Sequence, residues 1–104
     1  MSLADVLYKI KILEELAKLG ADDEVFIDVI DKLTKYKIHA LENDCSDIEN
    51  NLNKFEVKYG LPSKEFIIKF ESGEMGDEMD FIEWASLYDM YNRLKNRLNI
   101  VKGV

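Results

Sequence analysis

The middle of the chain carries apolar residues at alternating spacings of three and four. This pattern is typical of a helix that faces another helix along one seam. We predict one long helix from Asp23 to Tyr59, roughly 55 Å long at about 1.5 Å per residue. The apolar phase slips upstream of Ile38, so the regular seam lies in the second half of this helix. The seam consists of Ile38, Leu41, Cys45, Ile48, Leu52, Phe55 and Tyr59.

The predicted helix is longer than any other segment of the chain that could pack against its seam. No other segment of the 104-residue chain reaches roughly 55 Å. The seam therefore predicts a partner, which is a second copy of the chain, a different protein, or both. We expect a homodimer that buries the seam.

Two stretches leave alternatives open within the long helix. Val25 to Ile30 has the composition of a strand, but it follows a helix cap at Asp22 and continues without a turn signal. Glu42 to Asp47 is poor helix material, and Ser46 with Glu49 has capping-box spacing, so a break there is the alternative. The uninterrupted seam favours a single helix.

Three further helices complete an expected all-α fold. The first runs from its N-cap Ser2 to about Leu19, and the third is short, from about Lys64 to Ser72 after the cap Ser63. The last follows Asp77 as its N-cap and ends at about Asn99. We expect one domain over residues 1–104, a helical hairpin or bundle of about four helices. The first helix has its own apolar stripe of Leu3, Val6, Ile10, Leu13 and Ala17, widened by Leu7 and Leu16.

The composition narrows the classes of function. The 21 acidic and 14 basic residues give a net charge of -7, which argues against direct nucleic-acid binding and suits a basic protein partner or simply solubility. Cys45 is the only cysteine, so no internal disulfide can form and an intracellular setting fits. We find no signal-peptide pattern and no apolar run near 18 residues, so we expect a soluble, cytoplasmic protein.

The polar residues give little support for catalysis. His39 has no second histidine or cysteine at ligand spacing, and Cys45 fits the seam as a small apolar residue. The chain has no Gly-rich phosphate loop and no nucleophile paired with a base. We therefore expect no enzyme activity and no cofactor.

Four carboxylates form an acidic turn before the last helix, and three interpretations of it stay open. They could bind a hard divalent cation, although their spacing is not that of a calcium loop. Acids in the first turn of a helix are also favoured by the helix dipole without any metal. Alternatively, the turn is a docking edge for arginine or lysine of a partner. The acidic turn consists of Glu74, Asp77, Glu78 and Asp80.

Aromatic residues are more numerous in the last two helices than those helices need to cover each other. We expect most of them in the core, where some pack on the long helix. Tryptophan and tyrosine are also the types enriched where proteins meet. The set consists of Phe66, Phe70, Phe81, Trp84, Tyr88 and Tyr91.

One part of the chain carries a recognisable pattern. It begins at Tyr59-Gly60-Leu61-Pro62 and continues as Gly73-Glu74-x-Gly76-Asp77-x-x-Asp80-Phe81-x-Glu83-Trp84, followed by Leu87, Tyr88, Met90 and Tyr91. This pattern resembles short all-helical proteins of bacteria and archaea that are usually described as uncharacterised or as antitoxins of toxin–antitoxin pairs. The likeness covers residues 52–98, whereas the first fifty residues match only in being helical.

The resemblance implies a cytoplasmic, non-catalytic protein that binds and neutralises a toxin, commonly a ribonuclease. An acidic chain suits a basic toxin of this kind. Operator binding is not expected, because the chain shows no ribbon-helix-helix or helix-turn-helix signature. Two alternatives remain, a purely structural coiled-coil homodimer and a divalent-cation-binding domain. The match carries over as candidate contact residues Glu74, Asp77, Asp80, Phe81, Trp84, Tyr88 and Tyr91.

Overall fold

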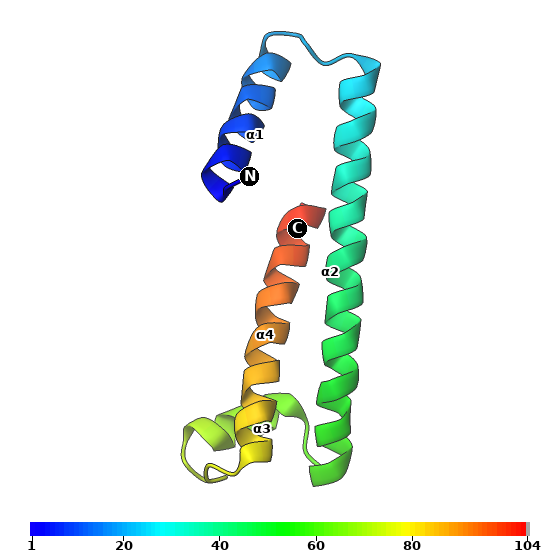
Figure 1. Ribbon diagram of the computed structural model, residues 1–104. Helices are drawn as coiled ribbons and strands as arrows, with labels where there is room; N and C mark the ends of the chain where they lie inside the picture. Colours follow the sequence, from blue (N-terminus) through cyan, green and yellow to red (C-terminus); the bar gives the residue numbers. More distant parts are fainter. Residues whose placement is uncertain (104) are drawn as a thin grey trace. The chain divides into compact units, whose positions relative to one another are not determined.

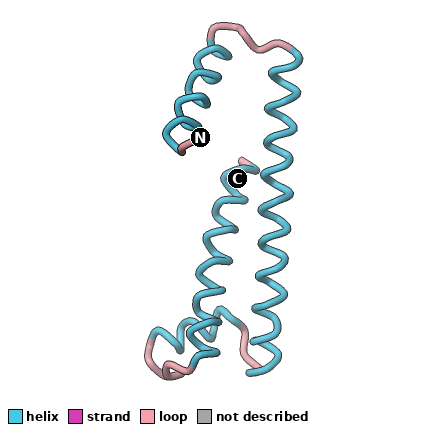
Figure 2. Tube along the Cα trace, viewed as in Figure 1, coloured by secondary structure: helices cyan, strands magenta, loops and turns pink. Residues whose placement is uncertain are grey.

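The computed structural model describes residues 1–103, in which helices are joined by loops and no strand occurs. Four helices follow one another, α1 (Leu3–Lys18), α2 (Glu24–Tyr59), α3 (Ser63–Glu71) and α4 (Met79–Lys102). Figure 1 and Figure 2 show these helices and the short loops that join them. The prediction of an all-α fold with one long helix is confirmed.

Local sequence signals explain the start of α1 and the continuity of α2. The Ser2 and Asp5 side chains form a reciprocal capping box at α1. The cap of α2 is one residue later than predicted, because Asp23 rather than Asp22 accepts the Phe26 N–H at 2.8 Å. α2 continues without interruption through 25–30 and 42–47, so the strand and the break considered for these stretches do not occur.

The ends of α3 and α4 differ from the predicted caps. Ser63 is the first residue of α3, and its N–H is bound by the Glu56 carboxylate of α2 at 2.7 Å. Asp77 does not cap α4, which starts at Met79 after Glu78. α4 continues past Asn99 because the residue that can adopt a left-handed conformation, Gly103 at φ +76°, comes only after Lys102.

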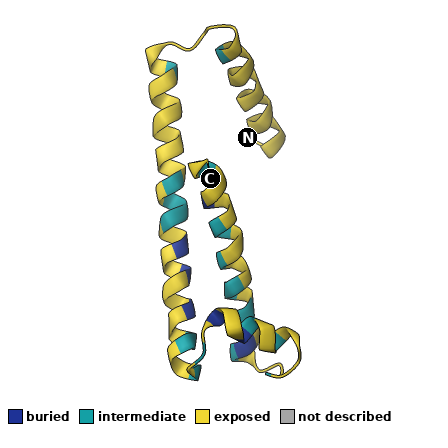
Figure 3. Cartoon of the chain, turned by 180° about the vertical axis from the view of Figure 1, so that it is seen from behind, coloured by how far each residue is buried: buried dark blue, intermediate teal, exposed yellow. Residues whose placement is uncertain are grey.

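The chain falls into two compact units, residues 1–35 and residues from 36 onward. In the first unit α1 has no buried residue, and its apolar stripe lies open to solvent. Figure 3 colours almost all of this unit as exposed. The division into two units does not decide whether residues 1–104 form a single domain, so the single domain stays a prediction.

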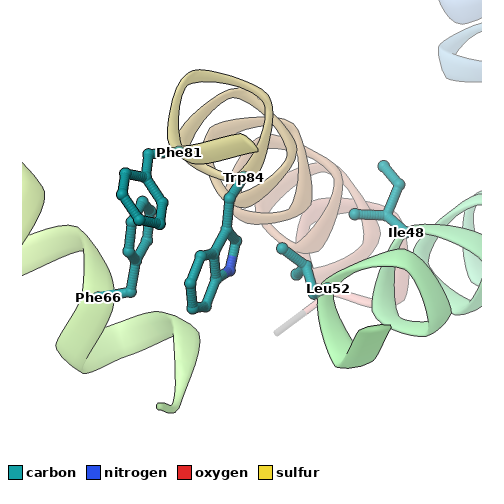
Figure 4. Close-up of a cluster of buried hydrophobic side chains, with 5 residues drawn as sticks. All are labelled: Ile48, Leu52, Phe66, Phe81 and Trp84. Carbon is teal, nitrogen blue, oxygen red and sulfur yellow. The ribbon is translucent and has the colours of Figure 1, made fainter. Parts of the chain in front are cut away.

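The second unit contains the core of the structure. The second half of α2 lies antiparallel to α4, and α3 closes one end. Polar contacts join α2 to α4 at points along their length, and they include Glu42–Lys102, Glu49–Tyr91 and Lys58–Asp80. The core between the helices, drawn in Figure 4, consists of Ile48, Leu52, Phe66, Phe81 and Trp84.

Most of the seam of α2 is filled from within the chain, whereas its first two members are half-buried. Cys45, Ile48 and Leu52 are buried, and Phe55 and Tyr59 pack against the same core. The 24 residues of α4 span roughly 36 Å, which exceeds the roughly 32 Å of the seam. The expectation that no segment could cover the seam was therefore wrong, because the relevant length was that of the seam and not of the whole helix. The homodimer stays a prediction, but the seam no longer requires it.

Candidate functional site

Two of the candidate contact residues have a packing role in the second unit. Trp84 is fully buried and stacks on Phe66, with ring centroids 3.8 Å apart and planes 6° from parallel. Its indole N–H donates to the buried Ser63 hydroxyl at 2.8 Å. Phe81 is buried beside the same rings. Neither side chain is open to a partner while the unit is folded.

Asp80 joins the end of α2 to the start of α4. Its carboxylate accepts hydrogen bonds from the Lys58 ammonium at 2.6 Å and from the Tyr59 hydroxyl. The bond from Lys58, followed by that from Tyr59, lowers the pKa of Asp80 below its usual value. The Asp80 carboxylate is therefore held as an anion by the chain's own donors.

The rest of the acidic turn lies open on the surface. Glu74, Asp77 and Glu78 are exposed in the loop and at the start of α4. In residues 1–103 no group of three or more His, Cys, Asp or Glu side chains comes together in an arrangement that could hold a metal. Asp80 is directed to Lys58 rather than toward a shared ligand position. The three exposed carboxylates of the acidic turn thus form a negatively charged edge.

Tyr88 and Tyr91 line a groove between α2, the start of α3 and α4. The groove has a volume of about 490 Å³. Glu49 and Glu56 contribute carboxylates from α2, seven residues apart and therefore on one face of that helix. We call this the acidic-aromatic groove. It is lined by Glu49, Asn50, Leu52, Asn53, Glu56, Pro62, Ser63, Lys64, Tyr88 and Tyr91.

The residue types that line the acidic-aromatic groove are suited to binding a cationic side chain. Carboxylates pair with guanidinium or ammonium groups, and the faces of tyrosine rings attract the same cations. Asn50 and Asn53 add amide groups that can accept from the remaining N–H donors. Lys64 is the one basic residue in this lining, so the lining carries two carboxylates against one ammonium group and is net negative.

Tyr91 fixes the position of Glu49 in the groove. Its hydroxyl donates to the Glu49 carboxylate at 2.9 Å. Burial, followed by the bond to Glu49, raises the pKa of Tyr91 to about 12. Tyr91 thus remains a neutral donor over the whole physiological pH range, and Glu49 keeps its orientation.

This raised pKa predicts an alkaline loss of stability that depends on Tyr91. The unfolded chain ionises near the ordinary value of 10, whereas folded Tyr91 ionises near 12, so its contribution is complete below pH 10 and is lost as the pH rises to 12. Relative to Tyr91→Phe, the parent should lose about 1–2 kcal/mol over that interval, after discounting for partial exposure. Urea unfolding at several pH values measures this, with the exposed Tyr8→Phe as control. Parallel pH profiles for parent and Tyr91→Phe would contradict the assignment.

The single histidine and the single cysteine lie outside this groove. His39 is an exposed residue whose Nδ1 lies 3.9 Å from a Glu42 carboxylate oxygen. Cys45 is buried, and burial raises the pKa of its thiol, which disfavours the reactive thiolate. Cys45 thus occupies the apolar seam position that the sequence predicted, and His39 is an exposed helix residue.

A functional proposal for this chain rests on its fold and on the acidic-aromatic groove. No protein-family model, no curated protein and no solved structure matches the chain. Within the described residues, none of the helices combines the length and the apolar character that crossing a bilayer requires. The chain is thus a small all-α protein with a groove lined by carboxylates and tyrosines.

Proposed function

We propose that the protein is a non-enzymatic, antitoxin-like binding module that neutralises a basic partner in the cytoplasm by direct contact. The observation that carries the proposal is the acidic-aromatic groove, which is lined by Glu49 and Glu56 together with Tyr88 and Tyr91. The occupant would be an arginine or lysine side chain of a toxin, and the expected toxin is an RNA-cleaving enzyme with a basic surface. The net charge of -7 would speed the encounter with such a partner.

The acidic turn is a second contact region for the same partner in this proposal. Glu74 and Asp77 are exposed and remain candidate contacts. The Asp80 carboxylate already accepts hydrogen bonds from Lys58 and Tyr59. Phe81 and Trp84 would then act indirectly, by holding α4 and α3 in place. The resemblance of residues 52–98 to antitoxins points in the same direction.

Co-expression with the product of the adjacent gene tests this function, since the members of toxin–antitoxin pairs are encoded side by side. The parent should bind that product and suppress its ribonuclease activity. Glu49→Lys should weaken binding by at least about tenfold, because it places a cation where the partner's cation sits. Glu65→Lys is the matched control, since it makes the same charge change at an exposed position of α3 outside the groove.

One outcome would reject the groove as the contact site, and another would reject the antitoxin function. If Glu49→Lys binds as tightly as the parent while Glu74→Lys does not, the contact lies at the acidic turn rather than in the groove. If the adjacent gene product neither binds nor loses activity, the antitoxin function itself is rejected. Circular dichroism of each variant establishes that the helices are still folded.

A further inference from the structure

The first unit presents an apolar face that the chain leaves uncovered. Leu3, Leu7 and Ile10 of α1 are 74%, 56% and 55% exposed, and the whole helix contains no buried residue. The N-terminal part of α2 within this unit has Ile30 and Leu33, which are also exposed. Two helices alone do not enclose a core, so a face of this kind is stable when another pair of helices covers it.

The extent of this face fits a specific interface. Its eight residues expose on the order of 700 Å² in total, which is close to the roughly 800 Å² that each partner buries in a standard interface. Large exposed apolar areas mark interaction sites, and most of this one lies on α1, where the apolar residues recur at spacings of three and four along one side of the helix. The face consists of Leu3, Val6, Leu7, Ile10, Leu13, Leu16, Ile30 and Leu33.

The charges of α1 identify the occupant. Two molecules that each carry -7 repel one another over most of their surface. α1 is an exception, because three acidic and three basic residues balance along its length. A second acidic copy can approach this helix without net repulsion, whereas a basic partner gains no net attraction from it. The six residues are Asp5, Lys9, Lys11, Glu14, Glu15 and Lys18.

The positions of two of these charges also fit a parallel pair of α1 helices. Lys9 and Glu14 border opposite edges of the apolar stripe and are five residues apart, which is the g-to-e′ spacing of a parallel coiled coil. When two copies of α1 lie side by side in the same direction, Lys9 of each faces Glu14 of the partner subunit. The two-fold symmetry forms this pair twice.

We propose that the apolar face of residues 1–35 is a homodimer interface, at which α1 pairs in parallel with α1 of a second copy. This interface is independent of the acidic-aromatic groove, which belongs to the second unit. The two sites share no residue, and each copy in the dimer contributes one groove.

Sedimentation of the full chain tests the interface. The parent should be a dimer at about 10 μM, and Ile10→Glu should weaken self-association by at least about a hundredfold, because two carboxylates would be buried between apolar stripes. Tyr8→Glu is the matched control, since Tyr8 lies on the opposite face of the same helix and should leave the dimer intact. A parent that is monomeric at this concentration, or a dimer unaffected by Ile10→Glu, would overturn the proposal.

Charge exchange then tests the parallel pairing. Lys9→Glu alone and Glu14→Lys alone should each weaken the dimer several-fold by opposing like charges, whereas the double variant should restore the parent's dissociation constant. A double variant as weak as the sum of the single changes would contradict the Lys9–Glu14 pairing. Because all these changes lie in the first unit, binding at the groove should persist, so failure of the dimer is distinguishable from failure of the proposed function.

Discussion

Replacing Trp84 by alanine should destabilise the second unit by about 3–5 kcal/mol, the range for removing a fully buried large aromatic side chain. The indole is 0% exposed and lies between the Phe66 ring of α3 and the aromatic residues of α2. Its loss would leave a cavity at the point where three helices meet. It would also leave the buried Ser63 hydroxyl without its donor. Urea unfolding followed by circular dichroism measures the change.

Two controls separate this effect from a general cost of losing an aromatic residue. Trp84→Phe keeps much of the stacking but removes the bond to Ser63, so we expect a loss of about 1–3 kcal/mol. Tyr36→Ala removes an aromatic side chain that is 65% exposed and should cost less than about 0.5 kcal/mol. A Trp84→Ala variant that loses no more than Tyr36→Ala would contradict the burial of the indole.

Shortening Leu52 to alanine should cost about 2–4 kcal/mol, because its side chain is buried between α2 and α4. The matched control is Leu33→Ala on the same helix, where the leucine is exposed in the first unit. In the monomer, this control should change the free energy of unfolding by less than about 0.5 kcal/mol. Equal losses at the two positions, measured by urea unfolding below the dimer dissociation constant, would contradict the internal filling of the seam.

The sequence predicted the helices well because their signals are local. The seam identified the buried face of α2, since Cys45, Ile48 and Leu52 are its most buried members. The caps were less predictable: Ser63 and Asp77 have the residue types of N-caps, but the loops before α3 and α4 start the helices elsewhere. Glu56 binds the start of α3 from a different helix, a contact that no local pattern contains.

The candidate site was only partly predictable for the same reason. Tyr88 and Tyr91 were among the predicted contacts, and the structure places both in the groove. Glu49 and Glu56 were missed as members of a site, although their spacing of seven puts them on one face of α2. Which face of α4 meets that face depends on how the hairpin closes, and this is decided by long-range packing of Trp84 and Leu52. Residue type alone likewise could not separate the buried Trp84 from a contact residue.

The measurement that tests the account most directly is an isotope-filtered nuclear Overhauser experiment on a mixture of labelled and unlabelled protein. Packing of α4 on the seam of its own α2 forms the acidic-aromatic groove, and the proposed dimer interface then lies in the first unit. We expect contacts from the Trp84 indole to Leu52 methyl groups within one chain, and contacts between chains confined to the first unit, for example at Ile10. Contacts between chains at Leu52 and Trp84 would contradict the account, since the seam would then be filled by the partner subunit.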